Sequence, residues 1–357
     1  MREEKDLIGT KELDEDAYYG INTARAMENF NLTNQTVNEH LIKAIVEIKK
    51  AAATVNYEID RLAEDKKEAI VQACEEILAG VLDDEFQLDA LQGGAGTSTN
   101  MMANEVVANR AIEILGGTKG EYEVVHPNQD VNLGQSTNDV YPTALKLASL
   151  RLLIPLTEEV ADLQDALQEK ESEFANILKL GRTQLQDAVP ITLGQEFSAY
   201  AEAISRDRWR LYKVSERLKK VNLGGTAVGT GLNAEPKFIF KVVQELRRNT
   251  NVSLAHAENM IDNTQNLDVF VEVSGLLKSL AVNLNKIAND LRLLSSGPQG
   301  GIGEIKLPQV QTGSSIMPGK VNPVIPEAIN QLSFLVTSND QAITLAAQSG
   351  QLELNAM

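Results

Sequence analysis

The sequence predicts a mainly α-helical protein in which long helices pack as a bundle. Hydrophobic residues make up 43% of the 357 residues but aromatic residues only 4%, which favours a core of small and branched aliphatic side chains between helices. Apolar residues also recur at steps of three and four, most clearly in residues 270–294. Short runs rich in Gly, Ser, Thr and Asn separate the apolar stretches, as expected where helices end.

Residues 1–140 are expected to form an N-terminal domain that is mixed but mostly helical. Within it, we expect residues 1–40 to be loops with little regular structure. Residues 41–83 carry apolar side chains at helical spacing. A further helix is expected between Met101 and Leu115, because two glycines follow it and stop it there.

Residues 141–357 are expected to form a central helix-bundle domain. Its expected helices are residues 145–178, 197–218, 270–294 and those that follow Pro326. Pro155 lies inside the first of them and predicts a kink. The apolar stripe of the third is so long that it requires a partner, in this chain or in another one. The domain is expected to be incomplete at its C-terminal end, because the sequence stops at Met357 without a helix cap.

The composition excludes several classes of partner and site. The formal net charge of −17 argues against nucleic acid or an acidic membrane as a partner. No apolar run is long enough to cross a bilayer, and the charged first residues do not form a signal segment, so a cytoplasmic protein is expected. Cys74 is the only cysteine, which excludes an intramolecular disulfide, and no Cys/His spacing is typical of a metal site.

The stretch best suited to hold an anion is residues 313–323, GSSIMPGKVNP. It places two hydroxyls, an ammonium and a carboxamide among glycines and prolines, which interrupt any regular helix or strand. It is not a phosphate-binding P-loop, because five residues separate Gly313 from Gly319 and Val321 follows Lys320. A serine here can act as a general base only if it is activated, and backbone N–H groups and the lysine could do this in a closed loop.

Other polar islands follow the helical stretches, at residues 93–100, 126–139, 181–190 and 222–231. The first either only caps the next helix or also binds an anion at that helix N-terminus, and both interpretations stay open. No histidine lies in the islands that contain Thr183 and Ser314, which argues against a Ser-His-Asp hydrolase. Hydroxyls, amides and one lysine suit a small dicarboxylate on which negative charge develops.

Four of these motifs, in their order along the chain, resemble the signatures of the fumarase/aspartase superfamily. They are residues 93–98 with Thr97, Gln135–Asp139, Gly181–Pro190 and Gly313–Pro323. The chain is most similar to the aspartase branch, because fumarases of this type carry His where Gln184 stands. The resemblance implies a carbon–nitrogen lyase that eliminates ammonia reversibly from L-aspartate to give fumarate. It implies no organic cofactor and no metal in the site, although divalent cations activate some members.

The resemblance also implies an architecture. Members are mainly α, and their central helix bundle assembles as a homotetramer whose active sites each gather segments from three subunits. They normally continue into a small C-terminal domain, which is expected to be absent from this chain.

The resemblance assigns roles to ten residues. Ser314 would be the base that removes a proton from C3 of the substrate, leaving a dianionic aci-carboxylate. The implied substrate ligands are Thr97, Ser136, Thr137 and Ser315 for the β-carboxylate, Lys320 and Asn322 for the α-carboxylate, and Asn138 and Thr183 for the leaving amino group, with Gln184 nearby.

Three positions depart from the usual family pattern. Asp130 stands where many relatives have His, Gly134 where Ser is usual, and Gln299 where Arg commonly follows Ser-Gly-Pro. Two alternatives therefore remain open. One is a fumarase that interconverts fumarate and malate, against which Gln184 counts. The other is a catalytically silent, structural member of the superfamily, for which the departures leave room.

Overall fold

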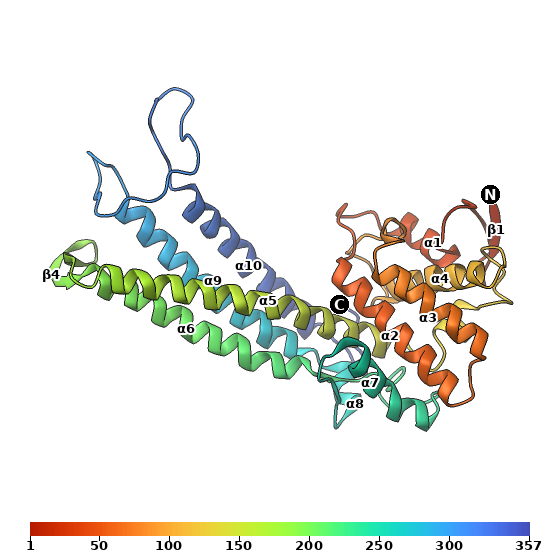
Figure 1. The fold of residues 1–357 in the computed structure, drawn as a ribbon. Helices are drawn as coiled ribbons and strands as arrows, with labels where there is room; N and C mark the ends of the chain where they lie inside the picture. Colours follow the sequence, from red (N-terminus) through yellow and green to blue (C-terminus); the bar gives the residue numbers. More distant parts are fainter. The chain divides into compact units, whose positions relative to one another are not determined.

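The computed structural model describes all 357 residues and is mainly α-helical, as predicted (Figure 1). The chain divides into two compact units, each built from separate segments. Unit 1 comprises Met1–Leu152, Glu216–Leu267 and Ala347–Met357, and unit 2 comprises Leu153–Ser215 and Asp268–Ala346. The expected division into domains at residue 140 stays a prediction.

Unit 1 is a cluster of helices around one central helix. It contains α1 (Ile21–Asn29), α2 (Glu39–Glu58), α3 (Glu64–Leu78), α4 (Thr97–Ile114), the start of α5 (Thr137–Glu173), α7 (Pro236–Thr250) and α8 (Met260–Gln265). Helix α2 packs against α3, α4 and α7, and its apolar face is fully buried. A short 3-10 helix (Asp83–Glu85), a π-helical turn (Pro127–Val131) and a two-stranded parallel pair, β5 (Lys220–Val221) with β6 (Ala255–His256), complete the unit.

The expectation of little regular structure in residues 1–40 is wrong. Strands β1 (Arg2–Lys5) and β2 (Thr10–Leu13) form an antiparallel hairpin, and α1 follows. The sequence hid the first strand because its buried residue is a carboxylate, Glu4, rather than an apolar side chain. Glu4 is satisfied by Arg2 Nε at 2.8 Å and by the backbone N–H of Ile21 at 2.9 Å. Strand β1 therefore lacks the alternation of polar and apolar residues by which a strand is predicted from sequence.

The helical spacing of residues 41–83 is confirmed, in two pieces. Helix α2 ends at Glu58, and α3 begins at Glu64. Asp60 between them has a left-handed backbone with φ of 61°, which interrupts the helix. Helix α4 starts four residues before the predicted range of residues 101–115, at Thr97, and ends at Ile114, with Leu115 as its C-cap.

Unit 2 is a bundle of long helices, which run side by side in Figure 1. They are the remainder of α5, α6 (Leu193–Leu218), α9 (Asp268–Leu294) and α10 (Val324–Gln348), and an antiparallel hairpin of β3 (Leu178–Thr183) and β4 (Gln186–Thr192) joins α5 to α6. All four helices expected after residue 140 are present, but the first ends at Glu173 instead of residue 178, because Leu178 already belongs to β3. Pro155 lies inside α5, which continues through it, and the kink expected there stays a prediction.

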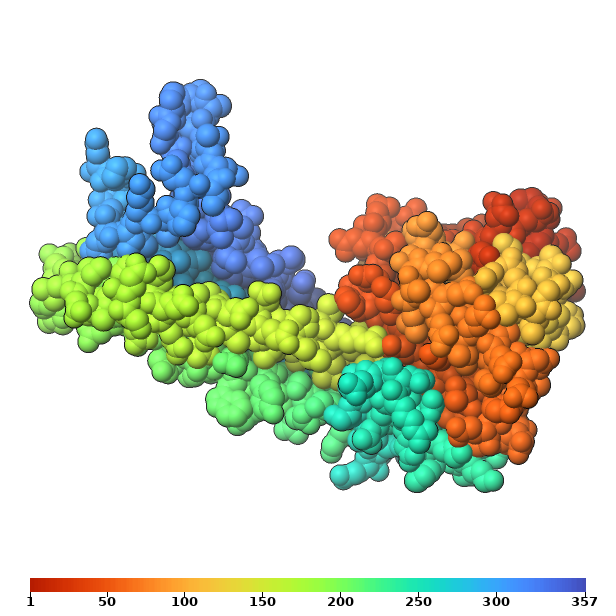
Figure 2. All heavy atoms as spheres, in the orientation of Figure 1, coloured from red at the N-terminus to blue at the C-terminus, as the bar shows by residue number.

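The chain between α9 and α10 has no helix or strand. Figure 2 shows it standing out from the unit 2 helices in two lobes, and the predicted anion loop lies within it. No helix of the chain combines the length and the apolar composition that a membrane span requires.

Candidate active site

The ten predicted site residues fall into two groups, one in each compact unit. Unit 1 carries Thr97, Ser136, Thr137 and Asn138, and unit 2 carries Thr183, Gln184, Ser314, Ser315, Lys320 and Asn322. Each group is described on its own.

In unit 1, the N-termini of two helices lie next to each other. Thr97 is the first residue of α4 and Thr137 is the first residue of α5. Asn100, in the first turn of α4, donates a hydrogen bond from Nδ2 to Thr137 Oγ1 at 3.1 Å. Gly96 makes the approach possible, because a Cβ there would lie 2.2 Å from the ring of Tyr141 in α5. Two sets of helix-end N–H groups and two positive dipole ends therefore point to one region, which favours an anion.

A reciprocal cap fixes the start of α5. Ser136 donates its backbone N–H to Asp139 Oδ1 at 3.0 Å, and Ser136 Oγ accepts from the N–H of Asn138 at 3.2 Å. The other carboxylate oxygen of Asp139 accepts from the N–H groups of Gly224 and Thr226, at 3.0 and 2.9 Å. Burial raises the pKa of Asp139 to about 6, against these backbone donors. Asp139 thus attaches the island at residues 222–231 to the α5 N-terminus.

Asn138 is held by the same island. Its side-chain Nδ2 donates to the backbone carbonyl of Ala227 at 2.8 Å. Its backbone carbonyl accepts from Asn222 Nδ2 at 3.1 Å. One N–H of the side-chain amide is used in this contact, and the amide oxygen can accept from a ligand.

Lys49 is a residue that the sequence interpretation missed. It lies in α2, is fully buried, and donates from Nζ to Asn132 Oδ1 at 2.7 Å and to Gln135 Oε1 at 2.9 Å. Burial lowers its pKa to about 7, against the attraction of the Asp139 charge. The helical spacing could have indicated this burial, because Lys49 stands four residues after Ile45 and so lies on the same side of the helix, where a buried lysine is rare.

In unit 2, the loop of residues 313–323 is closed at its base. The N–H of Gly313 donates to the carbonyl of Lys320 at 2.9 Å, and Asn322 Nδ2 donates to the carbonyl of Gly313 at 3.0 Å. A Cβ on Gly313 would lie 2.8 Å from the Lys320 oxygen, so this contact requires glycine. Asn322, expected to bind substrate, here uses its amide nitrogen inside the loop.

Ser314 receives the backbone donors that the sequence interpretation required. Its Oγ accepts from the N–H groups of Ile316 at 3.3 Å and Met317 at 3.1 Å. Two aligned N–H dipoles favour the deprotonated hydroxyl over the neutral one. Ser315 and Lys320 in the same loop are exposed.

Thr183 and Gln184 lie at the tip of the β3–β4 hairpin, which the sequence interpretation described only as a polar island. Gln184 and Leu185 form the two-residue turn, and both have positive φ, 54° and 61°. This is the backbone of a type I′ turn, in which Asn and Gly are usual. A strained backbone at non-glycine residues is typical of functional positions. The tip is exposed in the single chain.

The three departures from the family pattern have different structural settings. Asp130 Oδ2 accepts from Lys66 Nζ at 2.7 Å and from the N–H of His126 at 2.8 Å, so it stabilises the turn before the α5 cap. Gly134 has a φ of 75°, a backbone that glycine adopts without strain. Gln299 is exposed in the segment after α9.

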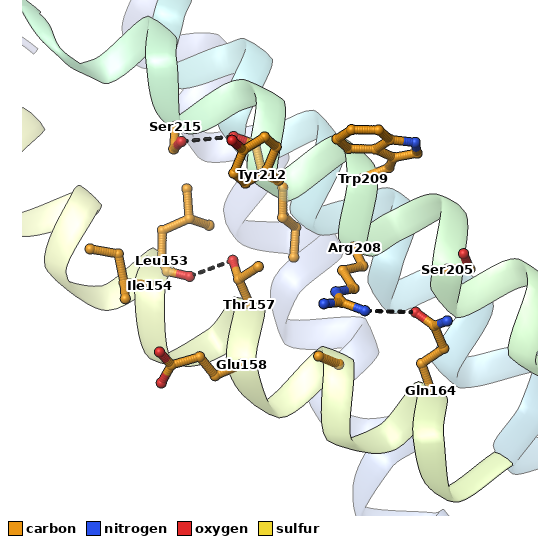
Figure 3. Close-up of a pocket in the computed structure, with 12 residues that line it drawn as sticks. Leu153, Ile154, Thr157, Glu158, Gln164, Ser205, Arg208, Trp209, Tyr212 and Ser215 are labelled. Atoms are coloured by element: carbon orange, nitrogen blue, oxygen red, sulfur yellow. Dashed lines mark hydrogen bonds between the residues drawn. The ribbon is translucent and has the colours of Figure 1, made fainter. Parts of the chain in front are cut away.

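A cavity that lies apart from the candidate site residues is present in unit 2. A groove of about 690 Å³ lies between α5 and α6 in unit 2, and Figure 3 shows its lining, with Trp209 turned outward. The hydroxyls of Thr157 and Ser215 donate to carbonyls of their own helices, each at 2.7 Å. The groove is mostly apolar and contains none of the ten residues, so it does not suit a dicarboxylate. No group of three or more His, Cys, Asp or Glu side chains could hold a metal ion.

The chain matches a protein family described as Lyase over residues 9–338. It is 52% identical over 356 residues to a protein named Aspartate ammonia-lyase from Bacillus subtilis, covering 100% of this chain and 75% of the relative. It is 48% identical over 360 residues to a protein of the same name from Escherichia coli, again covering 100% of this chain and 75% of the relative.

Two solved structures have closely similar folds. A "fumarate lyase:delta crystallin" from Brucella melitensis bound to cobalt superposes with a TM-score of 0.96 at 52% identity, covering 100% of this chain and 78% of the other. A class II fumarase from Schistosoma mansoni also reaches a TM-score of 0.96, at 36% identity, covering 99% of this chain and 78% of the other.

Proposed function

This chain belongs to the Lyase family of the fumarase/aspartase superfamily, and from that premise we propose that it eliminates ammonia reversibly from L-aspartate to give fumarate. Its similarity to aspartate ammonia-lyases extends over the whole chain. The structural observation that carries the proposal is the pair of helix N-termini joined by Asn100 and Thr137. It offers a preformed anion site in a chain whose net charge of −17 otherwise repels a dicarboxylate.

The reaction begins with proton removal from C3 by Ser314. The electron pair of the C3–H bond moves into the adjacent β-carboxylate and gives a dianionic aci-carboxylate. When this intermediate collapses, the C2–C3 double bond forms, the C2–N bond breaks and the amine leaves as ammonia. The hydrogen bonds from Ile316 and Met317 to Ser314 Oγ support the role of base, because they lower the cost of the alkoxide.

The remaining residues bind the substrate. Charge that develops on the β-carboxylate is stabilised by donors from Thr97, Ser136, Thr137 and Ser315. Lys320 and Asn322 bind the α-carboxylate, for which Asn322 exchanges its contact with Gly313 for one with the ligand. Asn138 and Thr183 orient the amino group, and the free amide oxygen of Asn138 suits that donor. Gln184 lies beside it.

The assembly is proposed to be a homotetramer in which three subunits contribute to each site. Support comes from large exposed apolar side chains on the unit 2 helices, among them Trp209, Tyr212, Leu332, Phe334 and Leu335. The exposed hairpin tip and loop also need a surrounding surface to exclude water. Light scattering on the purified chain tests this assembly, and a monomer at micromolar concentration would contradict it.

No cofactor is proposed for the chemistry. Divalent cations are proposed at most as activators, and the chain offers no ligand cluster for a resident metal. A cytoplasmic location is part of the proposal, as is the absence of nucleic-acid and membrane partners.

One assay tests the reaction. Fumarate absorbance is followed from L-aspartate and, separately, from L-malate. We expect fumarate from L-aspartate only. Turnover of malate alone would favour the fumarase alternative, since a fumarase has a closely similar fold. Turnover of neither would favour the silent, structural alternative.

A further inference from the structure

Glu304 occupies an unusual position in unit 2. Its backbone N–H donates to the carbonyl of Leu294, the last residue of α9, at 2.9 Å. The chain then runs from Glu304 to the loop that carries Ser314 without any helix or strand. The position of Glu304 therefore sets where that stretch starts.

The carboxylate of Glu304 holds both cations of strand β3. Oε1 accepts from Arg182 Nη2 at 2.5 Å, and Oε2 lies 3.0 Å from Lys179 Nζ. The side chains are only 22% (Glu304), 24% (Arg182) and 9% (Lys179) exposed, so solvent weakens these pairs less than typical surface ion pairs. The hydrogen bond from Arg182 lowers the pKa of Glu304 against the opposite effect of burial, and the ion pair with Lys179 lowers it further, so Glu304 is ionised at neutral pH.

A bulge in the hairpin prepares the contact. The register of β3 and β4 shifts between Leu180 and Arg182, at Gly181. A Cβ on Gly181 would lie 2.8 Å from the carbonyl oxygen of Val189, so glycine is needed here. Bulges commonly re-aim a side chain. Arg182, which meets Glu304, directly precedes Thr183.

The hairpin is also fixed to the helices through the same charges. Lys179 pairs with Glu196 of α6. Tyr200, one turn further along α6, lies within hydrogen-bond distance of Glu196 Oε1 (3.1 Å) and of Asp290 Oδ2 in α9 (2.9 Å). Without Glu304, this network would still join the hairpin to α6 and α9, but no longer to the chain that leads to Ser314.

We propose that Glu304 is a positioning residue that holds the hairpin carrying Thr183 and the stem of the loop carrying Ser314 with one carboxylate. This inference rests on the proposed function, which gives the hairpin and the loop their roles. In a tetramer whose sites gather segments from three subunits, one Glu304 can serve two sites at once. A displacement of reacting groups by about 1 Å costs about 100-fold in rate.

The test compares three substitutions in the full chain. Glu304→Gln keeps the shape but removes the charge, and it loosens both the hairpin and the loop stem. Arg182→Met loosens the hairpin alone. The control is Asp340→Asn, since Asp340 is another sheltered carboxylate of unit 2 that holds Ser274 (2.9 Å) and Lys278 (2.5 Å).

Hydrogen–deuterium exchange is the first readout and needs no activity. Glu304→Gln should speed exchange in residues 178–192 and in 304–323, Arg182→Met in 178–192 only, and Asp340→Asn in neither. Unchanged exchange in both segments of Glu304→Gln would overturn the proposal. If the unaltered chain does not convert aspartate, the proposed function fails, and exchange still decides whether Glu304 joins the two segments.

Kinetics are the second readout. Glu304→Gln should lower kcat at least about 10-fold and raise KM for aspartate, whereas Arg182→Met should act mainly on KM, and Glu304→Asp should recover part of kcat. Asp340→Asn should lower Tm and leave kcat/KM within about twofold. If Glu304→Gln lowered only Tm, as the control does, Glu304 would be a structural residue and the inference would be wrong.

Discussion

The Oγ of Ser314 accepts a hydrogen bond from the backbone N–H of Met317 at 3.1 Å, three residues further along the same loop. A second donor, the N–H of Ile316, lies 3.3 Å away. Both donors are part of the loop itself, so the two hydrogen bonds that support the proposed role of Ser314 as base are made within the single chain.

Substitution of the proposed base should abolish turnover without unfolding the protein. Ser314→Ala should lower kcat by about 1,000-fold, within the range that general bases contribute. Fumarate formation from L-aspartate measures this. Ser338→Ala, at an exposed serine of α10 in the same unit, is the control and should keep full activity. Near-normal turnover of Ser314→Ala would refute the assignment of the base.

Removal of the loop's cation should weaken substrate binding selectively. Lys320 is exposed, so Lys320→Met should leave Tm unchanged. A hydrogen bond to a charged group contributes about 1.5–3 kcal/mol, so kcat/KM should fall by about 10- to 100-fold. Lys306→Met, another exposed lysine of the segment before α10, is the matched control. Equal losses in both variants would point to general electrostatic attraction instead of a specific contact.

Gly134 should resist replacement although the family resemblance implies Ser there. Its φ of 75° strains any other side chain, and a Cβ would lie 3.3 Å from the ring of Phe238. Gly134→Ala should reduce the free energy of unfolding by about 1–2 kcal/mol. Gly93→Ala in the same unit, where a Cβ would make only an ordinary contact at 3.8 Å, should be close to neutral. Urea unfolding measures both, and equal effects would contradict the backbone argument.

The buried ammonium of Lys49 should make stability depend on pH in one direction. The pKa of Lys49 is about 7 in the folded chain and 10.5 for an ordinary lysine, as in the unfolded chain. The unfolded chain therefore binds more protons than the folded chain between these two pH values. The stabilisation associated with the neutral form of Lys49 is present above pH 10.5 and is lost as the pH falls through about 7. The free energy of unfolding of the unaltered chain, minus that of Lys49→Met, should therefore rise across this window, at about 1.4 kcal/mol per pH unit.

Urea unfolding between pH 7 and pH 10 measures this difference. Lys43→Met, the same change at a partly exposed position of α2, is the control. Its difference in the free energy of unfolding from the unaltered chain should not change with pH. A level or falling difference for Lys49→Met would show that burial of its charge does not control stability in this range.

The sequence predicted the helices of unit 2 because their apolar stripes repeat with a helical period that survives any tertiary context. It also predicted the family, and that resemblance is confirmed. It failed for β1, where the buried residue is Glu4, and it left the β3–β4 hairpin undetected. That hairpin is exposed on both faces at its tip, so no alternation of polar and apolar residues marks it.

The site could be predicted as a set of residue types but not as a geometry. Nothing in the pattern indicates that Asn100 meets Thr137, or that Asp139 holds the backbone of Gly224, because these contacts join segments far apart in sequence. The partners of Lys49 could not be predicted for the same reason, since both amides lie in another island. The roles of the ten site residues, and the tetramer, stay predictions.

The turn formed by Gln184 and Leu185 sets a limit for anyone who wishes to engineer this chain for heat resistance. Exchange of the pair for Asn-Gly, the usual choice for such a turn, would relax two strained residues at once. It would also remove the amide that we propose to lie beside the substrate. Only Leu185 can therefore be exchanged. A thermostable variant that remains active must keep Gln184 and its strained backbone.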